Sequence, residues 1–110
     1  MSQADIRKFV TFSHTFSDPW AGEKTDGSLE DAQDVTLSFR FAKPGKTQIQ
    51  RMQDKAVKAP GQAARNLLLD VVHPDDKQAL LDSMEEYPGV TMSLAGAILK
   101  GVGMSSDLGN

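Results

Sequence analysis

The sequence predicts an α+β protein, mainly α, in which a short N-terminal β element packs on a C-terminal bundle of about four short helices. Apolar residues alternate with polar ones over residues 35–41, and from Lys46 onward the apolar period lengthens from two to about 3.6. Prolines and glycines then divide the rest of the chain into short segments. The helical part alone, at roughly 55 residues, is small for an independent fold, so the strand should pack against it. A length of 110 residues predicts a single domain over residues 1–110.

Residues 1–34 are expected to form a β/loop region that is partly mobile. Residues 6–10 have helical spacing, but residues 10–16 alternate, and their aromatic and β-branched content favours a strand. His14 within it is interpreted as a partly buried structural residue. Residues 18–34 are rich in turn signals such as Asp26-Gly27-Ser28, which predicts a long loop. Loops of that length are either functional or disordered.

The clearest strand signal covers residues 35–41. One face is apolar and the other carries Thr36, Ser38 and Arg40, as expected for a strand with one buried face. Pro44 ends the strand because proline cannot donate to the ladder.

Two helices are predicted next, over residues 46–58 and 62–72. Thr47 followed by Gln50 fits a capping box that opens the first, and Pro60 suits the first turn of the second. The first helix has an apolar side and a basic side, while the second has a broad apolar face.

Two more helices are predicted, over residues 77–86 and 90–100. Pro74 and two aspartates follow His73, and we interpret this group as a helix start rather than a metal site. The last helix is apolar almost all round, so it is either central to the core, which we favour, or half of an interface. Gly101 is predicted to close it in a left-handed conformation. Residues 35–101 would then form the strand and helical core, and residues 102–110 a flexible tail.

Composition excludes several classes of protein. The chain has no cysteine, which rules out disulfides, a thiolate nucleophile and cysteine metal ligands. Its longest charge-free apolar stretch, residues 89–99, is shorter than the ~20 residues that a membrane helix needs. The first ten residues are polar and charged, unlike a signal peptide, so a cytoplasmic location is expected.

Catalytic motifs are also missing from the sequence. There is no Gly-x-Ser-x-Gly elbow, and Gly45-Lys46-Thr47 matches only the end of a phosphate-binding loop. The sequence therefore predicts a protein that is not an enzyme and that needs no cofactor or metal.

Charge is segregated along the chain despite a net charge of −3. Residues 40–65 hold seven basic residues and one acidic residue, and both flanking regions are acidic. The basic segment would either pair with acidic parts of the same or another chain, which we favour, or bind a polyanion. A DNA-binding regulator would use Arg51, Lys55 and Lys58, but the next helix has only Arg65 as a cation and would read DNA poorly.

The order of motifs from residue 35 to 101 resembles the small tail assembly chaperones of long-tailed bacteriophages and prophages. The residues that carry the resemblance are Phe39-Arg40-Phe41-Ala42-Lys43-Pro44, Thr47-Gln48-Ile49-Gln50-Arg51-Met52, Ala63-Ala64-Arg65-Asn66-Leu67-Leu68-Leu69, Val71-Val72, His73-Pro74-Asp75-Asp76, and Glu86-Tyr87-Pro88-Gly89 before a small-residue helix that ends in glycine. The resemblance implies a protein that binds without catalysis in the host cytoplasm. Such proteins hold the long helical tape-measure protein soluble until tail-tube subunits polymerise around it, and some have a longer, frameshifted form.

The candidate partner-binding residues are basic or apolar, and they lie in the first and last predicted helices. They are Arg51, Met52, Lys55, Lys58, Met92, Leu94, Ile98 and Leu99. The partners would be the tape-measure protein and other tail proteins, and the segregated charge would also allow a homo-oligomer. Two alternatives remain: a small structural component of a phage tail or head-completion complex, and a DNA-binding regulator that uses residues 46–58.

Overall fold

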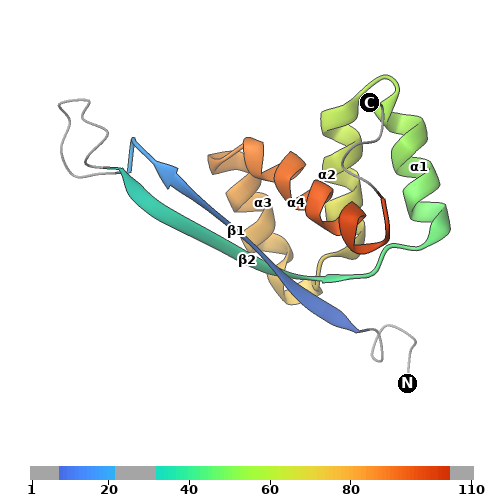
Figure 1. Ribbon diagram of the computed structural model, residues 1–110, viewed down its shortest axis with the longest axis horizontal. Coiled ribbons are helices and arrows are strands. Elements are labelled where there is room, and N and C mark those ends of the chain that lie inside the picture. The colour runs from blue at the N-terminus through green and yellow to red at the C-terminus, as the bar shows by residue number, and fades with distance from the viewer. Residues whose placement is uncertain (1–7, 22–31, 105–110) are drawn as a thin grey trace.

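The computed structural model describes residues 8–21 and 32–104. A two-stranded antiparallel hairpin is followed by four α-helices and a short 3₁₀ helix (Figure 1). The elements are β1 (Phe9–Asp18), β2 (Gln33–Ala42), α1 (Lys46–Ala56), α2 (Pro60–Val71), η3 (Pro74–Asp76), α3 (Lys77–Glu86) and α4 (Gly89–Gly101). The predicted α+β class, with a β element ahead of four helices, is confirmed.

The hairpin is longer than the sequence predicted. Its register runs without interruption from Phe9 opposite Ala42 to Asp18 opposite Gln33. The strand over residues 35–41 is confirmed, as is a strand rather than a helix over residues 10–16. The loop predicted for residues 18–34 is wrong at its two ends, which belong to β1 and β2. Residues 22–31 of that loop lie outside the described part of the chain.

The two faces of the hairpin differ in chemistry because side chains alternate along each strand. On the polar face, hydroxyl groups pair across the strands: Ser13 with Ser38 at 2.7 Å and Thr15 with Thr36 at 2.9 Å between oxygens. On the apolar face, burial increases toward the end of β2, where Phe41 is 1% exposed. The opposite end of the hairpin projects beyond the helices (Figure 1).

One core joins the hairpin to the helices. α4 contacts both β1 and α2, and α2 in turn packs on α1. Leu68 of α2 and Leu80 of α3 are fully buried. The core cluster comprises Phe39, Phe41, Ala64, Leu68, Val71, Val72, Leu80, Met84, Val90, Leu94, Ala95 and Ile98. Among the described residues, no helix is long and apolar enough to span a membrane.

Two predicted helix ends are corrected. The capping box lies two residues earlier than Thr47 and Gln50: the backbone N–H of Gly45 donates to Oε1 of Gln48 at 2.8 Å. Gly101 is the last residue of α4, and Gly103, at a φ of +96°, adopts the left-handed conformation. The start of the predicted tail is attached to α4, because the N–H of Met104 donates to the carbonyl of Leu99 at 3.0 Å. Residues 105–110 lie outside the described part of the chain.

Candidate partner-binding site

An open groove of about 480 Å³ lies between the projecting end of the hairpin and the turn that joins α3 to α4. We call it the hairpin groove. His14, Phe16 and Trp20 line it from β1 and the turn after β1, and Tyr87 and Val90 line it from the other side. The sequence brings these segments together through the core: Val90 anchors α4, and Pro88 breaks the chain between α3 and α4 so that Tyr87 faces β1.

Asp18 fixes the two sides of the hairpin groove to each other. Asp18 as a whole is 8% exposed, and its carboxylate accepts two hydrogen bonds, from the Tyr87 hydroxyl at 2.7 Å and from the Trp20 backbone N–H at 2.8 Å. Buried carboxylates need such partners, because desolvation without them is costly. The hydrogen bond to Asp18, followed by burial and by the charges of Asp18 and Glu86, raises the pKa of Tyr87. Tyr87 therefore stays a neutral donor at physiological pH.

Aromatic rings form the floor of the hairpin groove. Phe16 meets Tyr87 edge to face with ring centroids 4.8 Å apart, and His14 stacks on Phe16 at 5.5 Å. His14 is half-buried in this stack, which confirms the partial burial predicted for it. Edge-to-face and offset contacts of this kind hold aromatic rings in fixed positions. The rings of His14, Phe16 and Tyr87 are therefore held by one another.

Trp20 stands at the rim of the hairpin groove with 89% of its surface exposed. A large apolar side chain so far from the core does not stabilise the fold, but tryptophan is enriched among residues that dominate binding energies. Sequence reasoning missed this residue because it lies in a turn-rich segment without periodicity. The signal that could have identified it is a single tryptophan, next to a proline, in a segment whose sequence shows no apolar periodicity.

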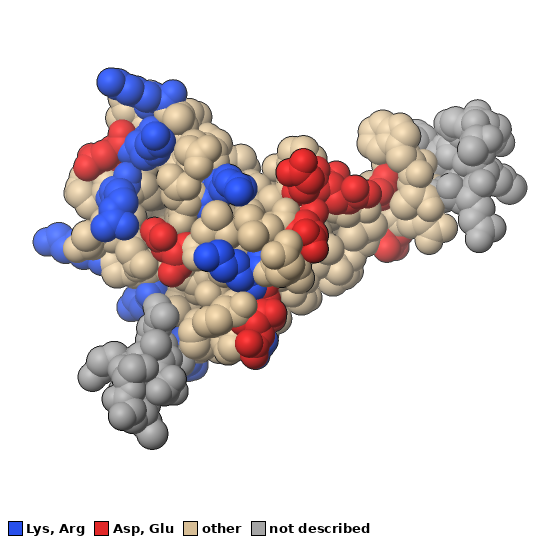
Figure 2. Space-filling model, turned by 180° about the vertical axis from the view of Figure 1, so that it is seen from behind, with Lys and Arg blue, Asp and Glu red and all other residues tan. Residues whose placement is uncertain are grey.

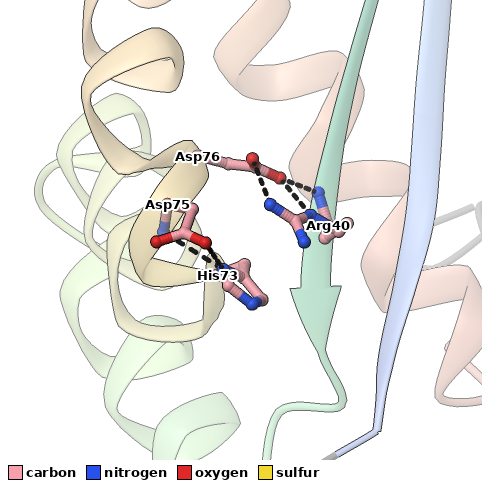
Figure 3. Close-up of polar contacts among 4 residues, drawn as sticks. All are labelled: Arg40, His73, Asp75 and Asp76. Carbon is pink, nitrogen blue, oxygen red and sulfur yellow. Dashed lines mark hydrogen bonds and ion pairs between the residues drawn. The ribbon is translucent and has the colours of Figure 1, made fainter.

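A second polar cluster covers the outer edge of β2 at Arg40 (Figure 3). Asp76 accepts from the backbone N–H and Nε of Arg40 at 2.8 and 3.0 Å, and from its terminal guanidinium nitrogen at 2.8 Å. These bonds lower the pKa of Asp76 from 3.8 to about 2 and raise the pKa of Arg40. Nδ1 of His73 accepts from the Asp75 backbone N–H at 3.1 Å, which confirms the predicted helix start. The printed hydrogen bonds of this cluster join β2 to the start of α3, because Arg40 lies on β2 and Asp76 precedes Lys77.

The candidate residues predicted from sequence do not converge on one surface. Arg51, Lys55 and Lys58 are exposed on or just after α1, a helix that buries none of its residues. Figure 2 shows basic side chains at this end of the molecule and acidic ones between the helical body and the hairpin. Arg51 lies 3.8 Å from Asp70 in an exposed ion pair.

The apolar candidates divide by burial. Leu94 and Ile98 are 1% and 2% exposed, so they are core residues, and they are removed from the partner-binding set. This agrees with the favoured interpretation of α4 as central to the core. Met92 is 55% exposed, whereas Met52 and Leu99 are half-buried. The hairpin groove contains none of the eight predicted residues.

Comparisons with known proteins place the chain in a family. The solved structure of the uncharacterised protein rbstp2171 from Bacillus stearothermophilus is similar, with a TM-score of 0.63 and 21% identity over 90% of this chain and 88% of that one. At that identity the likeness supports the fold alone. No curated protein matches the chain. The family described as Domain of unknown function (DUF6848) matches residues 25–109. Because this match spans well over half of the chain, the protein belongs to the DUF6848 family.

Proposed function

We propose that the protein is a non-catalytic chaperone of phage or prophage tail assembly, which binds the tape-measure protein and keeps it soluble before the tail tube forms. The observation that supports this function best is the hairpin groove, an open aromatic site with an exposed tryptophan at its rim. The resemblance in residues 35–101 supplies the identity of the client, a long helical protein.

The hairpin groove suits one face of an amphipathic helix. A volume of about 480 Å³ lies within the range of pockets that bury a drug-sized ligand, so it has room for more than one side chain. Helical clients present such side chains at i, i+3 and i+4. Trp20 can cover an inserted side chain from the rim. Glu86, exposed at the same groove, favours a client with lysine or arginine beside its apolar residues.

A chaperone must also release its client. Trp20 and Glu86 contribute exposed side chains, whereas Asp18 and Tyr87 are already hydrogen-bonded to each other. Binding would then rest on apolar contact with few new hydrogen bonds, which gives moderate affinity over many similar sites along the client. Such contacts are displaced when tail-tube subunits cover the same apolar surface.

The test is co-expression with the tape-measure protein of the same genome. We expect the client to be insoluble alone and to co-purify with the wild-type protein. Trp20→Ala should reduce co-purification without changing the fold, since Trp20 is 89% exposed. The matched control is Val57→Ala, an apolar residue 84% exposed beyond α1, which should leave capture unchanged. An insoluble client in the presence of wild-type protein, or equal capture by the two variants, would contradict the proposal.

The composition of purified virions distinguishes the chaperone from the structural-component alternative. A chaperone is absent from purified virions, whereas a tail or head-completion component is present in them. Detection of the chain at stoichiometric levels in purified particles would therefore replace the proposed function with this alternative.

A DNA-binding role is favoured by one observation, the exposed cations at α1. Arg51, Lys55 and Lys58 lie on or beside a helix that buries no residue, and Figure 2 shows basic side chains grouped there. DNA affinity would fall steeply with added salt, because phosphate contacts release counterions. If charge reversal of all three residues leaves the DNA affinity of the protein unchanged, the DNA-binding role is excluded.

A further inference from the structure

A second pocket, of about 420 Å³, lies where the start of β1 and the end of β2 meet the end of α4. Its lining includes the buried side chains of Phe41 and Ile98 and the side chain of Val10, which is 47% exposed. Its charged residues are Lys8 and Lys43, so we call it the lysine pocket. The hairpin groove lies against the first turns of α4, so the two sites are at opposite ends of that helix.

The two lysines occupy opposing positions at one end of the hairpin. Lys8 and Lys43 directly continue the register after its terminal pair, Phe9 opposite Ala42. Because side chains alternate along a strand, both lysines belong to the same apolar face as Val10. Like charges directly opposite each other on neighbouring strands are destabilising. An anion bound between the two ammonium groups would remove this repulsion.

No carboxylate within the described part of the chain neutralises these lysines. Neither Lys8 nor Lys43 forms an ion pair with another described residue, and no acidic residue lines the lysine pocket. The end of α4 does not occupy them either, since the carbonyl of Leu99 already accepts from the Met104 N–H at 3.0 Å. A helix C-terminus carries only about half a negative charge. The lysine pocket therefore keeps a positive charge beside an apolar wall.

The hydrogen-bonding groups of the lysine pocket select the class of ligand. Lysine ammonium groups donate and cannot accept, and none of the side chains that line the pocket is an acceptor. A peptide in the pocket would bring backbone N–H groups that find no side-chain acceptor there, and unpaired buried N–H groups are costly. An alkyl chain brings no such groups. A carboxylate has two oxygens, which can accept from the two lysines.

We propose that the lysine pocket binds a carboxylate with a single alkyl chain, which is the chemistry of a fatty acid. The carboxylate lies between Lys8 and Lys43, and the chain covers Val10 and reaches Ile98 of α4. A volume of about 420 Å³ is within the range of pockets that bury a drug-sized ligand, so a chain of medium length fits. This binding does not rest on the proposed chaperone function, because the hairpin groove is a separate site.

Isothermal titration calorimetry with sodium dodecanoate, kept below its micelle concentration, measures this binding directly. One molecule should bind per chain, and dodecylammonium, which has the same alkyl chain and a cationic head, should not bind. Trp20 supplies a second signal, since it lines the hairpin groove and not the lysine pocket. Its fluorescence should stay unchanged at saturation. A blue shift would place dodecanoate in the hairpin groove and overturn the proposal.

Removal of both lysines tests the site of the carboxylate. The double variant Lys8→Gln with Lys43→Gln should bind dodecanoate about five- to tenfold more weakly, because each exposed ion pair contributes modestly. The matched control is Lys55→Gln with Lys58→Gln, which makes the same change in net charge at two exposed lysines outside the pocket. This control should bind like the wild type. Equal losses in the two double variants would show an effect of net charge alone and would overturn the proposal.

Addition of a carboxylate tests the path of the alkyl chain. Val10→Glu places a negative charge in the lysine pocket and should abolish binding. Thr11→Glu adds the same charge at the next residue of β1, which is exposed on the opposite face, and should leave the affinity unchanged. No binding of dodecanoate by the wild type, equal affinity for dodecylammonium, or equal effects of the two glutamate variants would each overturn the proposal.

Discussion

Asp76→Asn tests whether the cluster at the outer edge of β2 stabilises the fold. Asp76 accepts three hydrogen bonds from Arg40, one of them from the backbone. The substitution removes the charge and leaves a single acceptor oxygen. Hydrogen bonds to charged groups contribute about 1.5–3 kcal/mol, and exposed ion pairs about 0.2–1 kcal/mol. The Asp76 and Arg40 side chains are 21% and 42% exposed, so their interaction is neither fully buried nor fully exposed and its energy should lie between these two ranges. We therefore expect a loss of about 1–2 kcal/mol in the free energy of unfolding.

Urea denaturation followed by circular dichroism measures this loss. Total stabilities of about 5–15 kcal/mol are usual, so the shift in midpoint should be well resolved. Asp70→Asn is the control, because Asp70 lies 3.8 Å from Arg51 in a pair whose side chains are 41% and 67% exposed. It should cost less than about 0.5 kcal/mol. Equal losses for the two variants would refute the reasoning.

The pH dependence gives a second, independent signature. The pKa of Asp76 is about 2 in the folded protein and 3.8 in the reference state. Because the folded-state pKa is depressed, its contribution is fully present above the unfolded value and is lost as the pH falls toward 2. The difference between wild type and Asp76→Asn should therefore be constant above about pH 5 and should narrow between pH 4 and 2. A difference that stays constant down to pH 2 would show that the charge of Asp76 contributes nothing.

Three further predictions follow from burial and from the hairpin groove. Leu68→Ala, at a fully buried core position, should cost about 2–5 kcal/mol in urea denaturation, and Val57→Ala, 84% exposed, should stay within about 0.5 kcal/mol. Tyr87 is the chain's single tyrosine, so its absorbance near 295 nm should titrate with a midpoint above the ordinary tyrosine pKa of 10.0, and Asp18→Asn should lower that midpoint. Since the folded-state pKa of Tyr87 is raised, the stability that its hydrogen bond to Asp18 contributes is lost as the pH rises above 10. Fluorescence of Trp20, the single tryptophan, should be that of a water-exposed indole and should shift to the blue when an apolar client peptide fills the groove; an unshifted spectrum with bound peptide would place the client elsewhere.

Local patterns predicted the elements because each depends on residues close in sequence. The alternation over residues 35–41 identified β2, since one of its faces is buried in the core. Pro60, Pro74 and Pro88 mark helix starts or breaks, and the helix bounds fall within a few residues of the predicted ones. The errors at helix ends have a local cause as well: the N-cap is Gly45, which has no side chain to signal it.

The candidate site was not predictable in the same way, because it is made of contacts between distant segments. Asp18 meets Tyr87 across 69 residues, and Arg40 meets Asp76 across 36. Periodicity identifies which face of an element is apolar, but not which turn will lie against it. The Tyr87-Pro88-Gly89 segment predicts a break between helices and contributes to the resemblance, but nothing in it indicates a contact with β1. The burial of Leu94 was ambiguous for another reason, since a helix apolar all round has no periodicity that marks its exposed side.

The hydrogen bond between Asp18 and Tyr87 has a consequence for the order of folding. Contacts between residues far apart in sequence carry a large loop-closure entropy, so they form after local structure. The hairpin pairs residues 15 to 33 apart and the α3–α4 turn joins residues adjacent in sequence, whereas the groove between them needs a contact across 69 residues. Phe16 and Tyr87 of the groove are only half-buried, whereas Leu67 and Leu68 of α2 are 2% and 0% exposed. Native-state hydrogen exchange should therefore show the projecting end of the hairpin opening at lower free energy than α2. The binding surface would then be the last part of the molecule to assemble and the first to open, while the helical core stays folded.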